Sequence, residues 1–120
     1  MPAKQTFAQN QVPLRIFQGC KFERTFRQRM SDGTYRVFTG VTATCSFVPQ
    51  LSGDSVEATV TVTTLDGESA LAVVIPASDT QTMEIKEYRW NIKIIPSGGD
   101  ADDAEYLVGG IATVIEETTP

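Results

Sequence analysis

Histidine is absent from this 120-residue sequence, and its absence excludes several common kinds of active site. A Ser-His-Asp triad, a Cys-His pair and the usual histidine-containing zinc sites all need an imidazole. The phosphate-binding motifs GxGxxG and GxxxxGKS/T are also missing, and the two cysteines, Cys20 and Cys45, are too far apart for a CxxC motif. Any catalysis would rest on carboxylates alone, and no two of them form a convincing pair. We therefore expect a non-enzymatic protein without a cofactor or a metal centre.

Long apolar runs are missing as well. None approaches the ~20 residues of a membrane span, and residues 1–13 lack the apolar core of a signal peptide. We expect a chain that folds in a cytoplasm and has no membrane partner, so its thiols stay reduced. Two small buried thiols are therefore the favoured interpretation of Cys20 and Cys45. A disulfide is the alternative, because a hairpin centred on residues 31–33 would place the two cysteines face to face.

Alternation of apolar and polar residues is the strongest positive signal. In the run 88–95, YRWNIKII, every second side chain is apolar, which is typical of a strand with one face on a core. The run 106–115 is apolar at both parities, as expected for a strand covered on two sides. A polar loop joins them, so we predict an antiparallel hairpin. With a register symmetric about Asp100, Gly110 lies opposite Trp90, and its missing side chain would make room for the indole.

Further alternating runs and turn residues extend this pattern over most of the chain. Strands are predicted near residues 14–18, 20–29, 41–47, 56–63 and 71–75, and a short helical turn within 77–87. Seven or eight short strands with almost no helix indicate an all-β sandwich over residues 14–115. Residues 1–13 form a predicted N-terminal arm and residues 116–120 a polar tail. The predicted core contains Phe22, Phe26, Phe47, Tyr88, Trp90, Ile92, Gly110 and Val114.

The charges divide unevenly along the chain, although the net charge is −5. Residues 1–45 hold seven basic and two acidic side chains, a net +5, and residues 46–120 hold three basic and thirteen acidic ones, a net −10. Lys21, Arg27 and Arg29 share the predicted outer side of one strand, which we call the basic face. Nucleic acid is a poor partner for it, because the protein is acidic overall and no aromatic residues are interleaved. A solvated face and a protein interface both remain open.

The loop between the two core strands carries an acidic cluster of Asp100, Asp102, Asp103 and Glu105. Its spacing does not match an EF-hand, so a solvated loop tip is favoured over a calcium site. A further hypothesis is a contact between copies, in which the acidic cluster of one copy meets the basic face of the next and closes a ring. The arm contributes one aromatic side chain, Phe7, as a candidate for the same kind of interface.

Several segments also share an order and spacing with a known family. They are Gly19, Phe22 and Phe26 in a Gly-x-x-Phe-x-x-x-Phe strand, and the runs 38–43 (FTGVTA), 78–80 (SDT), 88–92 (YRWNI) and 106–114 (YLVGGIATV). Together they resemble small phage virion proteins and the immunoglobulin-like N-terminal domain of phage baseplate upper proteins. The resemblance implies an immunoglobulin-like antiparallel β-sandwich of seven to eight strands. It also implies a non-enzymatic virion component, assembled in the host cytoplasm and present in many copies.

Three functional hypotheses follow. The first is a tail-side structural adaptor, in the neck, baseplate or fibre attachment, that forms a homo-oligomer and contacts other virion proteins. The second is a capsid decoration or cement protein. The third is a carbohydrate- or calcium-binding module whose site is Trp90, Tyr88 or the acidic cluster, and it is disfavoured because aromatic residues at the inward parity of a strand usually belong to the core.

Overall fold

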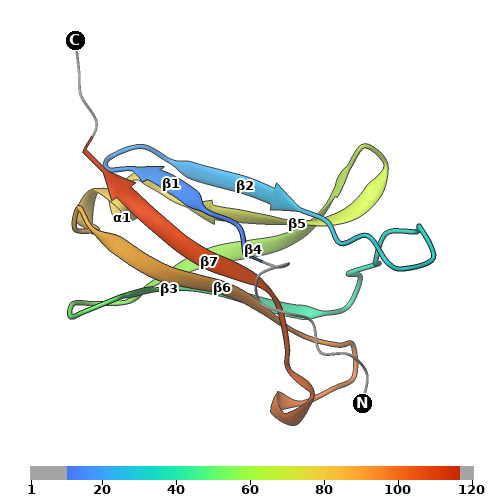
Figure 1. Ribbon diagram of the computed structural model, residues 1–120. Helices are drawn as coiled ribbons and strands as arrows, with labels where there is room; N and C mark the ends of the chain where they lie inside the picture. Colours follow the sequence, from blue (N-terminus) through green and yellow to red (C-terminus); the bar gives the residue numbers. More distant parts are fainter. Residues whose placement is uncertain (1–10, 117–120) are drawn as a thin grey trace.

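A computed structural model describes residues 11–116 of the chain, and their regular secondary structure is almost entirely β-strand (Figure 1). The expected all-β class is confirmed. Phe7 lies outside the described residues. No helix within the described range is long and apolar enough to cross a bilayer. The elements are β1 (Leu14–Phe17), β2 (Phe22–Phe26), β3 (Thr42–Pro49), β4 (Val56–Leu65), β5 (Glu68–Ile75), α1 (Ala77–Thr82), β6 (Glu87–Ile95), the 3-10 turn η2 (Ala101–Asp103) and β7 (Glu105–Ile115).

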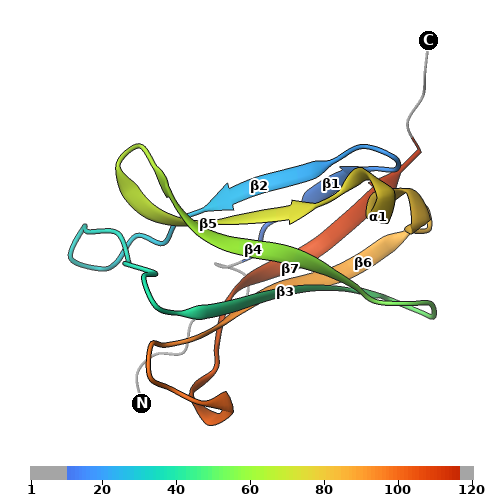
Figure 2. The same cartoon turned by 180° about the vertical axis from the view of Figure 1, so that it is seen from behind.

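The seven strands form one sheet in the order β1-β7-β6-β3-β4-β5-β2. The sheet folds over at β4, because residues 56–58 pair with β3 and residues 59–65 pair with β5. Two layers result, with β3, β6 and β7 on one side and β2 and β5 on the other (Figures 1 and 2). All pairs are antiparallel except β1 with β7, which run parallel. This pair departs from the predicted antiparallel arrangement. The turn after β1 takes the chain to β2 in the other layer, so β1 does not form a hairpin with β2 and instead pairs with the free edge of β7.

The predicted β6–β7 hairpin is confirmed, and Gly110 lies opposite Trp90. The expected reason for the glycine was wrong. A Cβ atom on Gly110 would lie 2.6 Å from the carbonyl oxygen of Val12, and the residue has a φ of +152° that disfavours other side chains. That same oxygen accepts a hydrogen bond of 2.9 Å from Nε1 of Trp90. The missing side chain therefore makes room for the backbone that the indole binds, rather than for the indole itself.

Aromatic rings join the two layers around Trp90. The indole stacks on Phe47 of the neighbouring strand at 6.1 Å and meets Phe26 of the opposite layer at 5.5 Å, both measured between ring centroids. Phe22 meets Phe47 edge to face at 6.3 Å. Such pairs stabilise a fold by about 0.5–1.5 kcal/mol each beyond the area they bury. Phe22 and Phe26 are half-buried against the core, while Phe47, Tyr88, Trp90, Ile92, Gly110 and Val114 are buried.

The hairpin that would have paired the two cysteines does not form. Residues 28–36 make only a small local turn, with a bridge between Arg29 and Tyr35. The strands on either side belong to different layers, because β2 pairs with β5 and β3 lies between β4 and β6. Cys20 is half-buried, Cys45 is buried, and both are thiols. Burial, with a smaller contribution from Glu57, raises the pKa of Cys45 to about 12, so it stays protonated at neutral pH.

One hydroxyl ties together two of the connections that cross between the layers. Thr80 of α1 is the buried polar side chain among residues 11–116. Its Oγ1 accepts a hydrogen bond of 3.1 Å from the backbone N–H of Gly19 and donates one of 2.8 Å to the carbonyl of Cys20. Gly19 and Cys20 turn the chain from β1 to β2, and α1 carries it from β5 to β6. The two crossings therefore hold each other in place at one end of the sheet.

We expect Thr80→Val to lower the free energy of unfolding by about 1–3 kcal/mol, because it keeps the shape of the side chain but removes both bonds from a buried site. Thr82→Val is the matched control. Its hydroxyl bonds the carbonyl of Asp79 at the surface, where water can replace it. Urea unfolding of the two variants gives the comparison, and equal losses of stability would contradict the role of Thr80.

Gly110→Ala should destabilise the protein by about 1–3 kcal/mol more than Gly98→Ala, because only the former drives a methyl group into the Val12 backbone. Both glycines have positive φ, +152° and +80°, but a Cβ on Gly98 meets nothing within 4 Å. Tryptophan fluorescence should also change in Gly110→Ala, since Val12 must move away from the indole. Similar unfolding midpoints for the two variants would refute the proposed contact.

Candidate functional site

Three connections between strands gather at one end of the sheet, which we call the loop end (Figure 1). They are residues 27–41 between β2 and β3, residues 66–67 between β4 and β5, and residues 96–104 between β6 and β7. The β1–β2 turn, α1 and the β3–β4 hairpin lie at the opposite end. Most of the charged residues predicted as interface candidates lie in or beside these three loops, so the fold brings together segments from distant parts of the sequence.

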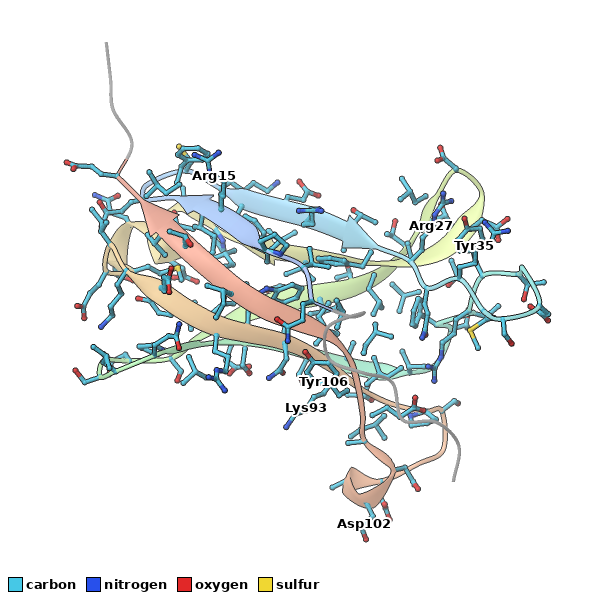
Figure 3. The ribbon with its side chains drawn as sticks, viewed as in Figure 1. Arg15, Arg27, Tyr35, Lys93, Asp102 and Tyr106 are labelled. Atoms are coloured by element: carbon cyan, nitrogen blue, oxygen red, sulfur yellow. The ribbon has the colours of Figure 1, made fainter. Side chains whose placement is uncertain are left out.

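Arg27 connects two of the three loops. Its guanidinium lies 4.3 Å from the centre of the Tyr35 ring, which is a cation–π arrangement (Figure 3). It also donates a hydrogen bond of 3.2 Å to the carbonyl of Leu65 and lies 4.0 Å from the carboxylate of Asp66. Arg27 therefore stabilises the arrangement of its own loops and is less available to a neighbouring copy than the sequence suggested.

An ion pair that the sequence did not reveal joins the long β2–β3 loop to β7. Arg36 donates two parallel hydrogen bonds to the carboxylate of Glu105, at 3.2 and 3.1 Å. It also donates one of 3.2 Å to the side chain of Gln28. Glu105 was predicted to contact the basic face of another copy; both of its carboxylate oxygens bind Arg36 within the same chain, so they are less available for that contact. Such bidentate geometry is stronger and more directional than an ordinary surface pair.

The tip of the β2–β3 loop is also held by local hydrogen bonds. The carboxylate of Asp32 accepts bonds from the hydroxyl and the backbone N–H of Thr34, at 2.6 and 2.9 Å. These bonds, led by the hydroxyl, hold the pKa of Asp32 below its usual range. Glycine at position 33 supports the same turn with a φ of +93°. The loop is therefore ordered by its own polar groups rather than by burial.

The acidic cluster caps its own 3-10 turn. The carboxylate of Asp100 accepts a hydrogen bond of 3.0 Å from the backbone N–H of Asp102, and that of Asp103 accepts one of 2.9 Å from the N–H of Asp100. This reciprocal capping gives Asp100 and Asp103, two of the four acidic residues of the cluster, a structural role in the turn. Asp102 projects from the tip (Figure 3). In the described part of the chain, no three potential ligand side chains are grouped to hold a metal ion.

The predicted basic face is not a single surface. Lys21 lies at the end opposite the loops and pairs with Glu23 at 3.5 Å. The strand ends at Phe26, so Arg27 and Arg29 belong to the following loop and no longer alternate with strand residues. The contact in which all three cations meet an acidic cluster therefore needs revision. Arg29 remains exposed at the loop end, in the same loop as the exposed apolar side chains Met30 and Val37.

A second candidate site is a hollow on the outer side of β6 and β7. Its volume is about 380 Å³. The rings of Tyr88 and Trp90, which were considered as ligand platforms, are 2% and 1% exposed and so cannot bind a ligand at the surface. Any ligand would instead meet the outward side chains. The hollow is lined by Gln11, Arg89, Trp90, Asn91, Tyr106, Gly110 and Ile111.

Comparison with known proteins does not identify the chain. Its sequence matches no protein-family model, and no curated protein is significantly similar to it.

A double-mutant cycle with Arg36→Ala and Glu105→Ala should give a coupling free energy of about 0.5–1 kcal/mol that decreases at high salt. The pair is partly exposed, at 21% and 47% for the two side chains, so the solvent screens it in part. Lys21 with Glu23, more exposed and not bidentate, is the matched control and should couple by close to zero. Equal coupling in the two cycles, measured by urea unfolding, would show that the Arg36 pair has no special role.

Proposed function

We propose that the chain is a non-enzymatic structural protein of a bacteriophage virion. In this proposal it acts on the tail side, in the neck, baseplate or fibre attachment, as an adaptor between copies of itself and other virion proteins. It assembles in the host cytoplasm and needs no nucleic acid, membrane or cofactor as a partner. The single observation that carries the proposal is the loop end, where ordered loops present exposed apolar and charged side chains together.

The proposed fold is an immunoglobulin-like sandwich, and the strand neighbours support it. When β1 to β7 are lettered A to G, the neighbours β3, β6 and β7 correspond to strands C, F and G of an immunoglobulin domain. The neighbours β2, β5 and β4 correspond to strands B, E and D. The segments that carried the family resemblance also have consistent places, since Gly19 forms the turn before β2 while Phe22 and Phe26 pack on the core. In this chain β4 joins the two sheets into one.

The proposed contact centres on apolar side chains of the loop end. Val37 is 67% exposed and lies in the same loop as Met30. Large exposed apolar side chains bordered by charges are typical of protein interfaces. The loop beneath them is fixed by the Arg36 and Arg27 contacts, so little conformational entropy is lost when a partner binds. Arg29 and Asp102, both exposed, supply opposite charges at the rim.

Light scattering on the purified protein, at low and high salt, tests this proposal. We expect a defined oligomer for the wild type and a shift toward monomer for Val37→Asp, because the new charge must be desolvated in the contact. Leu51→Asp is the control: Leu51 is 94% exposed at the opposite end, so its replacement should leave the mass unchanged.

A wild-type monomer at both ionic strengths would overturn self-assembly, and an equal effect of Leu51→Asp would overturn the assignment to the loop end. Electron microscopy of labelled particles would then distinguish the tail from the capsid shell. Label on the shell would favour a decoration protein and contradict the tail-side position.

A further inference from the structure

The hollow on β6 and β7 lies on the side of the sheet that faces away from the core. The paired residues Asn91 and Gly109 open onto this side, as do Arg89 and Ile111. Glycine at position 109 is required here, because a Cβ atom would overlap the hydroxyl of Tyr106 and lie 2.5 Å from the carbonyl oxygen of Trp90. The hydroxyl of Tyr106 therefore lies close to the Gly109 backbone, and Tyr106, which is 38% exposed as a residue, lines the hollow.

Polar side chains surround this ring. Arg89, Asn91 and Gln11 all line the hollow. Lys93 lies opposite Tyr106 in the strand register and is exposed beside it (Figure 3). Within residues 11–116, the side chains of Arg89 and Lys93 take part in none of the ion pairs, whose cations are Lys21, Arg27, Arg36 and Lys86. Two cations without a carboxylate therefore flank a half-exposed aromatic ring.

We propose that this hollow binds a saccharide that carries a carboxylate, of the hexuronic acid class. The ring of Tyr106 offers an apolar face for the C–H side of a sugar ring. The amides of Asn91 and Gln11 can each donate to one sugar hydroxyl and accept from another. Arg89 supplies a planar pair of donors that matches a carboxylate, and Lys93 adds a second positive charge. A shallow cavity with few polar groups around one aromatic wall suits a small ligand of this kind.

This site differs from the earlier hypothesis of a carbohydrate- or calcium-binding module, whose site was Trp90, Tyr88 or the acidic cluster. It also does not depend on the virion role, because binding can be measured on the isolated protein. The carboxylate and the sugar ring make distinct contributions here, so ligands that lack one or the other can separate them.

Methyl glucuronide, methyl glucoside and acetate provide the test. We expect methyl glucuronide to shift the backbone amide signals of residues 89–91 and 106–111 in isotope-labelled protein. Methyl glucoside, which has a hydroxymethyl group in place of the carboxylate, should bind about tenfold or more weakly, as expected for loss of a charged hydrogen bond. Acetate should bind more weakly than the glucuronide because it lacks the sugar ring.

Variants assign the contacts. Arg89→Gln should reduce the affinity for methyl glucuronide to that for methyl glucoside, and Tyr106→Ala should abolish binding of both sugars. Arg15→Gln is the control, since Arg15 is an exposed cation of β1 far from Tyr106 (Figure 3), and should bind like the wild type. The amide spectrum of each variant reports whether it is folded, and Arg89, being exposed, can be replaced without loss of a core contact.

Three results would overturn the proposal. One is the absence of shifts at tens of millimolar glucuronide. Another is equal binding of acetate and glucuronide, which would mark a simple anion site. The last is a shift of the same signals when the protein alone is concentrated, which would assign the hollow to a contact between copies.

Discussion

The buried indole of Trp90 imposes the condition on which the rest of the fold depends. A buried N–H without an acceptor is costly, and the acceptor here is the carbonyl of Val12, two residues before β1 begins. The N–H of Val12 in turn donates to the carbonyl of Gly109 at 2.8 Å. The centre of the core, the edge strand β1 and the β7 backbone are therefore joined through one residue. Gly110 is needed because any side chain there would separate them.

The sequence predicted well what depends on neighbouring residues. Alternation along the runs 88–95 and 106–115 located the β6–β7 hairpin, and the predicted register is right as far as Ile92, after which the pairing shifts by one residue. Asp66-Gly67 marked the turn between β4 and β5. It failed where the partner of a strand lies far away in the chain. Alternation shows which side chains face inward but not which edge a strand joins, so the pairing of β2 with β5 and of β1 with β7 was missed.

The candidate sites show the same difference between features set by neighbouring residues and contacts between distant segments. Arg36 and Glu105 are 69 positions apart, and no local pattern connects them. The basic face was predicted by assuming that strand alternation continues past Phe26, whereas the strand ends at that residue. Charge counts along the chain were also misleading about surfaces, since β1 and β2 from the basic part lie at the two edges of the sheet, each beside a strand from the acidic part. Basic and acidic segments that are separate in the sequence are therefore neighbours in the folded sheet.

The strand order also has a consequence for how this chain can fold as it is made. The two strands that come earliest in the described range, β1 and β2, lie at the two edges of the sheet, and β1 pairs with β7, the last strand of that range. Strands β2 to β5 can pair with one another before the later strands are made, whereas β1 has no partner until β7 emerges. The complete sheet therefore has to await β7 and a contact of long sequence separation, which is slow to form compared with local hairpins. Until then, the apolar side chains of β1 are exposed to other nascent chains.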